Sequence, residues 1–514
     1  MLAALAYVNA LHNPFVYDDI SEIVDNRSIV SISQLGLVLR HSITRPLTNL
    51  SYALDYAAWG LNPIGYHLTN LALHAIDVIL WFAVVRVLVQ NRWKDVVAFA
   101  AASLFAVHPM MTEGVGYVSS RAELLAGVFF FTSFLCFRRA LMSGSARWIA
   151  TGFITFALSI CAKETAAMLP LVLIAYDWLL FSGDQPPRRV RVWRVHAPLI
   201  ALLVLGAVAR VWLYVAFERP ASGLLLSNVA VNIPVIARYL SLLMVPTALS
   251  VVHPVDPVTS IANPDLLGAA VVLVALGTAA WLVRRREPLI LFGLLWFLVL
   301  LLPSSVLTVI SQKAQPIAEH RVYLASCGFF IAIAAAGAGW LANSGASSPA
   351  RRGVATVAFG CVLAVLFTLT IQRNRVWSDP VLLWSDAVKK APRVWMAHEG
   401  LAEAYHLVGD CESATNEFRR AVLLRPEQLP AYLGLAACLQ ETDDQAAALR
   451  VVRLALTRTP PGPDALLALA ELEEMSHNTP EALRLCAAAL RFEARRAESS
   501  ACVARNTNTA EPLK

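Results

Sequence analysis

Long apolar runs, separated by short charged stretches, dominate the chain up to about residue 375. A run of roughly 18 or more apolar residues is typical of a helix that crosses a membrane. The N-terminal run MLAALAYVNAL is too short to cross alone, so we interpret it as the end of a first spanning helix. With it, the pattern predicts an all-α membrane domain over residues 1–375 with about eleven spans. The other ten are expected at 66–89, 96–114, 121–141, 147–163, 165–181, 196–217, 264–283, 288–310, 322–342 and 353–372.

Basic residues cluster between these runs and indicate which side of the membrane each loop faces, because Lys and Arg favour the cytoplasmic side. There are five such clusters, at residues 86–94, 138–147, 188–194, 284–286 and 351–352. They fall on one side only if the segment 229–252 does not cross. That segment contains Asn232, Pro234, Arg238 and Pro246, and we expect it to be re-entrant or interfacial. The opposite, outer side then receives the polar loop 12–64 and everything after about residue 373.

The polar C-terminal part repeats with a period of 34 residues: Pro392, Pro426 and Pro460 are so spaced, as are Ala387, Ala421 and Ala455. Small and large residues alternate as in tetratricopeptide repeats, where pairs of helices interlock. We predict a tetratricopeptide (TPR) solenoid over 376–492, which offers a binding surface and implies no chemistry. The tail, 493–514, is predicted to be disordered.

Apolar residues make up 57% of the chain and charged residues only 15%, against about half and a quarter in soluble domains. The net charge of +6 comes from the clusters between spans, so a nucleic-acid partner is not expected. The eight cysteines occur singly and suit neither a zinc motif nor a disulfide framework. We expect them to be small buried side chains, and we expect no required cofactor, with a divalent metal left open.

Two adjacent acids, Asp18 and Asp19, follow the first apolar run directly. A carboxylate at a membrane boundary costs free energy unless it is solvated or paired, so such groups are candidates for function. One could act as general base on a hydroxyl, bind a metal ion or cap a helix. Taken alone, the pair is explained equally well as solvated loop acids.

Other polar side chains gather at span ends on the same outer side. Arg and Lys there suit a lipid-linked phosphate, although isolated ones also snorkel to the interface. Lys163 and Glu164 could simply form a salt bridge, and His67 and His74 could be core histidines. The candidates are Arg45, His67, Glu113, Arg121, Lys163, Glu164, Glu319, His320 and Arg321.

Five stretches occur in order before the repeats: FVYDD, RPLTNLSYALDYAAWGLNPIGYHLTNLALH, LFAVHPMMTEGVGYVSSRAELLA, AKETAAMLPLVLIAYD and EHRVYL. In this combination the chain resembles the transmembrane-and-TPR O-mannosyltransferases and their bacterial relatives. The resemblance implies a GT-C fold and transfer of a sugar, expected to be mannose, from a polyprenyl- or dolichyl-phosphate donor. The acceptor would be a Ser or Thr hydroxyl of a protein on the non-cytoplasmic side, reached through the repeats.

On this resemblance Asp18 and Asp19 match the acidic motif of the family and are the expected catalytic residues. Candidates for holding the donor phosphate are Arg45, Arg121, Lys163 and Arg321, and candidates for orienting the site are His67, Glu113, Glu164, Glu319 and His320. The chain departs from the family in its short first helix and its short repeat array.

Two other functions stay open: a GT-C enzyme acting on a lipid or envelope glycan, and a non-catalytic scaffold. Transport is less favoured, since the spans contain no visible inverted repeat. The expected location is a bacterial inner membrane with the repeats in the periplasm, or the endoplasmic reticulum membrane in a eukaryote.

Overall fold

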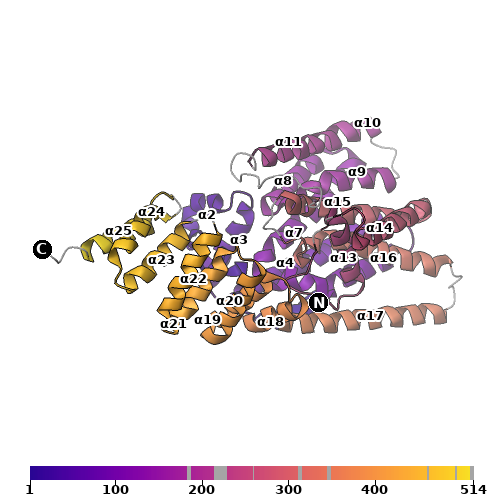
Figure 1. Cartoon of the computed structure of the whole chain (residues 1–514). Helices are drawn as coiled ribbons and strands as arrows, with labels where there is room; N and C mark the ends of the chain where they lie inside the picture. The colour runs from indigo at the N-terminus through magenta and orange to yellow at the C-terminus, as the bar shows by residue number, and fades with distance from the viewer. Residues whose placement is uncertain are drawn as a thin grey trace. The chain divides into compact units, whose positions relative to one another are not determined.

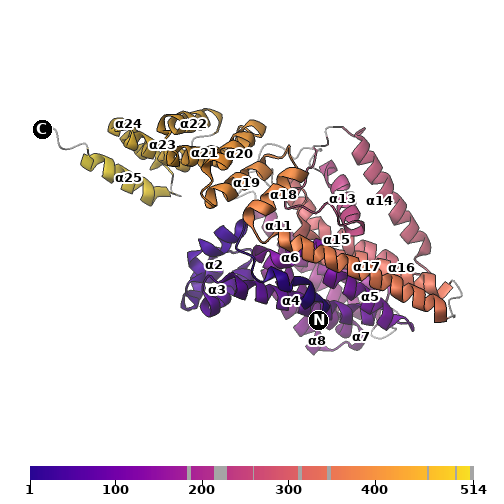
Figure 2. The same cartoon turned by 90° about the horizontal axis from the view of Figure 1, so that it is seen from below.

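A computed structural model describes residues 1–181, 187–213, 229–256, 258, 260–310, 315–343, 349–459, 462–492 and 495–509. Every regular element in these ranges is helical. The chain divides into two compact units, Met1–Val251 with Val255–Asp379, and Val252–Pro254 with Pro380–Lys514. Figures 1 and 2 show the two sets of helices from two directions.

Unit 1 is built from helices of very different lengths. Long apolar helices alternate along the chain with shorter ones. The helices are α1 Leu2–Tyr7, α2 Leu35–His41, α3 Pro46–Trp59, α4 Pro63–Leu88, α5 Lys94–Val107, α6 Thr112–Gly116, α7 Arg121–Ser143, α8 Ala146–Ala162, α9 Leu169–Leu179, α10 Arg188–Arg191, α11 Ala197–Leu213, α13 Asn232–Met244, α14 Pro264–Val283, α15 Pro288–Ile310, α16 Tyr323–Asn343 and α17 Pro349–Val376.

Seven helical segments in the described residues are long and apolar enough to cross a membrane, or eight if α5 and the bent segment Pro109–Gly116 form one span. The chain is therefore a multi-pass membrane protein. The count is lower than the eleven spans that hydropathy predicted, because three of the predicted segments form short helices. These are α1, α8 with 17 residues and α9 with 11 residues. The last four residues of the predicted span 196–217 lie outside the described residues.

The segment 229–252 forms the 13-residue helix α13, which is too short to cross. This agrees with the interpretation that it does not span. Its apolar residues Val235, Tyr239, Leu242 and Leu243 are buried against the rest of unit 1.

All five basic clusters lie at one end of the helical bundle. Arg86, Arg92 and Lys94 surround the turn between α4 and α5, and Arg138, Arg139 and Arg147 surround the turn between α7 and α8. The cluster 284–286 precedes α15, whose start lies beside the end of α16, since a Cβ on Gly339 would be 2.6 Å from Glu287 Oε1. The basic stretch 188–194 follows the end of α9, with Arg191 Nε 3.0 Å from Asp177 Oδ1. Arg351 and Arg352 lie in the first turn of α17.

At the opposite end of the bundle α4, α7 and α16 begin, and α5, α8 and α17 finish. Thr370 of α17 donates to the Val107 carbonyl at the end of α5 (2.7 Å). Trp377, just after α17, stacks on Tyr117, just before α7, with ring centroids 5.6 Å apart. Figure 2 shows α4, α5, α16 and α17 running side by side. This end also contains the loops of residues 11–62.

The core of unit 1 is aromatic. The Trp296 ring of α15 lies among Trp81, Phe130, Phe131 and Phe134, all fully buried. Its indole N–H donates to the Leu324 carbonyl of α16 (2.8 Å). Gly293 and Gly328 let these two helices approach closely, since a Cβ on either would lie 2.3 Å from the carbonyl oxygen of the other. Small residues commonly serve this purpose between membrane helices.

Unit 2 is a TPR solenoid of antiparallel helices, coloured orange to yellow in Figure 1. The interlocking alanines that the 34-residue period predicted are buried in every repeat, for example Ala402, Ala436 and Ala470. Gly400 and Gly434 lie against the rings of Trp384 and Phe418, where a Cβ would come within 2.3 Å. Pro460 lies outside the described residues. The helices are α18 Pro380–Lys390, α19 Trp395–Leu407, α20 Cys411–Leu424, α21 Leu429–Glu441, α22 Gln445–Arg458, α23 Pro463–Met475, α24 Thr479–Ala489 and α25 Arg496–Thr509.

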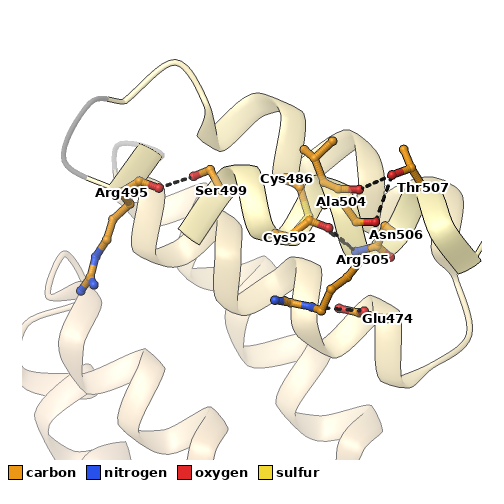
Figure 3. The surroundings of a disulfide bond; sticks show 10 residues. Glu474, Cys486, Arg495, Ser499, Cys502, Ala504, Arg505, Asn506 and Thr507 are labelled. Carbon is orange, nitrogen blue, oxygen red and sulfur yellow. Dashed lines mark hydrogen bonds and ion pairs between the residues drawn. A yellow bond between two sulfur atoms is a disulfide. The ribbon is translucent and has the colours of Figure 1, made fainter. Parts of the chain in front are cut away.

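The tail that was predicted to be disordered from residue 493 contains α25, which packs on the last repeat; residues 493–494 and 510–514 lie outside the described residues. The prediction that the cysteines are small buried side chains outside any disulfide is also wrong. Cys486 of α24 and Cys502 of α25 form a disulfide with Cα atoms 5.7 Å apart, and Cys161 and Cys361 are exposed. Figure 3 shows the bond, with Arg505 reaching Glu474 and Asn506 donating to the Cys502 carbonyl. The polar composition of this segment gave no sign of an ordered helix, because two of the residues on its buried face are polar. That face contains Ser499, Cys502 and Asn506.

Candidate functional site

A polar cavity of about 240 Å³ lies at the end of unit 1 where α4, α7 and α16 begin. Its walls come from the segment after α1, the loop before α3 and that helix itself, the turn into α7, the end of α8 and the turn before α16. They consist almost entirely of polar side chains. The lining residues are Asp18, Glu22, Ser42, Thr44, Arg45, Thr48, Asn49, Tyr52, Tyr117, Ser119, Ser120, Ala122, Lys163 and His320.

The two adjacent acids point in different directions. Tyr17 has a positive φ of 55°, a conformation that costs a non-glycine residue free energy, and its ring stacks on Tyr117 at 6.0 Å. After this turn Asp18 is exposed and lines the cavity, while Asp19 is fully buried. The Asp18 backbone N–H donates to the Tyr117 hydroxyl (3.1 Å), which fixes the position of the loop against the segment just before α7.

Asp19 is held by three hydrogen bonds. The Ser119 N–H and hydroxyl donate to its Oδ1 (2.7 and 2.6 Å), and the Val16 N–H donates to its Oδ2 (3.2 Å). Burial raises the pKa of Asp19 to about 7, against the opposing effect of these donors. Asp19 is thus a buried anchor for the loop that carries Asp18.

Two cations on the cavity wall are each paired with a carboxylate. Arg45 donates from Nε and Nη2 to Glu164 (3.3 and 2.9 Å), and both side chains are half-exposed. Lys163 Nζ lies 2.6 Å from Glu123 Oε1, and this pair is buried. Burial raises the pKa of Glu164, but Arg45 and Lys163 outweigh it and lower that pKa to about 2. Because a guanidinium has five N–H donors and an ammonium three, both cations retain donors for an anion in the cavity.

His320 completes this wall from the start of α16. Its Nδ1 lies 2.5 Å from Glu113 Oε1, and Glu113 Oε2 accepts from the Glu319 N–H (3.0 Å). Glu113 therefore fixes both the turn before α16 and the imidazole orientation. The structure thus brings together Asp18, Arg45, Lys163 and His320 on the wall. Asp19 and Glu113 are buried, Glu113 contacts His320, and the half-exposed Glu164 is paired with Arg45.

Arg121 is not on the cavity wall. It is fully buried, with Nη1 2.6 Å from Asp55 Oδ2, Nε donating to Asn70 (2.7 Å) and Nη2 donating to the Tyr66 carbonyl (2.9 Å). These contacts join α3, α4 and α7, so the side chain connects three helices instead of facing a ligand.

Three more predicted residues lie away from the cavity. Arg321 donates to the Gln315 carbonyl (2.6 Å), and Glu319 accepts from the Ser250 N–H (2.6 Å). His67 Nε2 contacts the Asn13 carbonyl (3.0 Å). Each has a partner that explains its burial or orientation within unit 1.

The sequence analysis missed several wall residues, among them Glu22, Tyr52, Tyr117 and Ser119. Tyr117 and Ser119 lie in the stretch GYVSSR, in which Arg121 was the predicted site residue. Tyr is common at membrane interfaces and Ser is common in turns, so neither type stands out without knowledge of the cavity.

The fold and the site define a class of protein: a multi-pass helical membrane protein with a polar, charged cavity at one end of its bundle, followed by a TPR solenoid. No family model matches the chain. Its homologues are the TMTC protein O-mannosyl-transferases.

The chain is 36% identical over 205 residues to the protein O-mannosyl-transferase Tmtc1 of Drosophila melanogaster. The aligned region covers 37% of this chain and 23% of that protein. It is 25% identical over 508 residues to human protein O-mannosyl-transferase TMTC1, covering 86% of this chain and 56% of the relative. It therefore aligns with about half or less of the length of these relatives. Those proteins are by name glycosyltransferases.

Among solved structures, a TPR protein of Thermus thermophilus is 22% identical, with a TM-score of 0.23, covering 30% of this chain and 96% of that one. A TM-score of this size is too low to support an argument.

Proposed function

We propose that the protein is a membrane glycosyltransferase that transfers a sugar, mannose by analogy with its homologues, from a polyprenyl-phosphate donor to Ser or Thr hydroxyls of proteins. The observation that carries the proposal is the cavity in which Asp18, Arg45, Lys163 and His320 meet from four separate parts of the chain. Its volume of about 240 Å³ is below that of typical drug-sized pockets, roughly 300–1,000 Å³. That suits a single sugar with its phosphate.

In the proposed reaction Asp18 is the general base. The acceptor oxygen attacks the sugar C1, its proton passes to the Asp18 carboxylate, and the bond from C1 to the phosphate oxygen breaks with its electron pair on that oxygen. Arg45 and Lys163 stabilise the charge that develops on the departing polyprenyl phosphate. Asp19, held by Ser119 and Val16, positions the loop, and Glu113 positions His320.

The distribution of charge supports a non-cytoplasmic site. All five basic clusters lie at the bundle end opposite the cavity, and such clusters favour the cytoplasmic side. The Cys486–Cys502 disulfide supports an oxidising compartment for unit 2. On this proposal the cavity and the solenoid share one compartment, and the solenoid contributes to acceptor binding.

The test is Asp18→Asn with the full-length protein in liposomes that contain a polyprenyl-phosphate mannose donor and a Ser/Thr-rich acceptor peptide. Loss of general-base catalysis should lower transfer by about 10²- to 10⁴-fold, with an unchanged melting temperature. Asp25→Asn is the matched control, since Asp25 is an exposed acid of the same loop that does not line the cavity. Unchanged transfer in Asp18→Asn would remove the proposed base, and label appearing only in the lipid fraction would replace the protein acceptor by a lipid.

A further inference from the structure

Four side chains with metal-binding atoms converge in the first full repeats of unit 2. His406 lies near the end of α19, Cys411 begins α20, and Cys438 and Glu441 lie in the last turn of α21. The imidazole nitrogen and the two sulfur atoms all lie within 4.8 Å of one another. Within the described residues, this is the group of three or more His, Cys, Asp or Glu side chains whose ligand atoms lie close enough together to hold one metal ion.

Glu441 joins the group through both carboxylate oxygens. Its Oε1 lies 2.9 Å from His406 Nε2, and its Oε2 lies 3.0 Å from Cys411 Sγ. Both thiols are buried, whereas His406 and Glu441 are partly exposed, with 31% and 56% of their side-chain surface accessible. The cluster therefore has a buried sulfur side and an open side through which an ion can enter.

We propose that Cys411, Cys438, His406 and Glu441 form a zinc site. Two thiolates with an imidazole and a carboxylate are a ligand set that Zn²⁺ accepts in tetrahedral geometry, with bonds of about 2.3 Å to sulfur and 2.0–2.1 Å to nitrogen. Such bonds bring tetrahedral donor atoms to about 3.8 Å of one another or less, which small side-chain rotations achieve from the present arrangement. Binding displaces the two thiol protons to solvent.

The 34-residue repeat explains why these residues meet. His406 and Glu441 are 35 residues apart, so they lie at the ends of first helices in consecutive repeats, and Cys411 opens the helix between them. A bound ion would connect α19, α20 and α21, and so add a metal crosslink between two repeats that the contacts of Glu441 with His406 and Cys411 already join. Coordination would also protect the thiolates in an oxidising compartment. Short zinc motifs place ligands two to five residues apart, and this is why sequence inspection found no site.

The experiment uses full-length protein in detergent, purified without a histidine tag, reduced, stripped with a chelator and equilibrated with ZnCl₂. Mass spectrometry of bound metal should give about one zinc per chain. Cobalt in place of zinc should produce the visible bands of a tetrahedral ion and thiolate charge-transfer absorption. Loss of a group that only hydrogen-bonds to a metal ligand already costs about 10- to 100-fold in metal affinity. Cys411→Ser and Cys438→Ser should therefore each lower the affinity for zinc by about 100-fold or more.

His406→Ala and Glu441→Ala keep the test valid if the buried cysteine variants fail to fold, since these partly exposed residues can be removed without leaving a cavity. Each should weaken zinc binding, and zinc should raise the melting temperature of the wild type more than that of either variant. Cys161→Ser and His477→Ala, which change an exposed thiol and an exposed imidazole elsewhere, should bind zinc as the wild type does.

Two results would overturn the proposal. One is that the wild type binds zinc no more strongly than the Cys411→Ser/Cys438→Ser double variant does. The other is a Cys411–Cys438 disulfide in protein isolated without reductant, which would make the pair a covalent crosslink. Both readouts are independent of sugar transfer, so they stand apart from the outcome of the Asp18→Asn test.

Discussion

Two arginine–carboxylate pairs lie at the same end of unit 1 and differ above all in access to solvent. Arg121 and Asp55 are almost completely enclosed, and Arg121 also donates to a side-chain amide and to backbone carbonyls. Arg45 and Glu164 lie at the cavity with 37% and 49% of their side chains accessible. The same distinction separates Asp19 from Asp18.

The comparison shows that enclosed polar residues, here Arg121, Asp55 and Asp19, can fix the position of a site without lining its surface. Enclosed pairs leave a charge uncompensated when one partner is lost, which is costly. Accessible pairs contribute little to stability, because water replaces the partner. Of the two arginine pairs and the two adjacent acids, the enclosed Arg121, Asp55 and Asp19 should therefore govern folding, and the accessible Arg45, Glu164 and Asp18 should govern turnover.

The largest effect on stability is expected for Arg121→Met. Removing the guanidinium leaves Asp55 buried without its partner and should cost about 3–5 kcal/mol, to the point of losing folded protein. Thermal unfolding in detergent measures this, with Arg86→Met as the matched control, since the exposed Arg86–Asp95 pair should be worth no more than about 1 kcal/mol. Equal losses in both variants would contradict the role given to enclosure.

Asp19→Asn tests the enclosed acid through pH. The pKa of Asp19 is about 7 in the folded protein and near its usual value when unfolded, so the folded state holds the proton more tightly. The wild type should therefore lose stability as pH rises from about 4 to 7, on the order of a few kcal/mol, and Asp19→Asn should lack this part of the dependence. Parallel stability–pH curves for the two proteins would show that Asp19 does not titrate as described.

Arg45→Gln tests the accessible side of the comparison. A charge-assisted hydrogen bond to the donor phosphate is worth about 1.5–3 kcal/mol, so catalytic efficiency should fall by about 10- to 100-fold while the melting temperature stays unchanged. Arg40→Gln, at an exposed arginine of α2 outside the cavity, is the control. A lower melting temperature with unchanged kinetics would reverse the assignment.

Glu164→Gln should have the smallest effect, with the opposite sign. The low pKa of Glu164, about 2, keeps its carboxylate ionised at working pH, where it competes with the phosphate for Arg45. Its removal should raise donor affinity by up to about tenfold and change stability by less than about 1 kcal/mol. If donor affinity falls instead, Glu164 acts mainly by orienting Arg45.

Much of unit 2 could be predicted because its contacts are local in sequence. Ala414, Ala448 and Ala482 recur at 34-residue intervals and are all fully buried. The turns between paired helices recur as well, with positive φ at Gly409, Asp443 and His477. Gly409 adopts that conformation without steric cost, whereas Asp443 and His477 belong to types that adopt it only occasionally, so the last two turns carry a weaker signal in their residues.

Hydropathy by itself determined that unit 1 is a helical membrane bundle, and the order of its polar motifs identified the ends from which a site could be built. It could not decide which polar groups meet, because Arg45 and Glu164 are 119 residues apart, and Glu113 and His320 are 207 apart. Only tertiary packing determined that Asp18 faces the cavity while Asp19 and Arg121 are enclosed. The physical reason is that a residue's type and position are local properties, whereas its access to water depends on helices from distant parts of the chain.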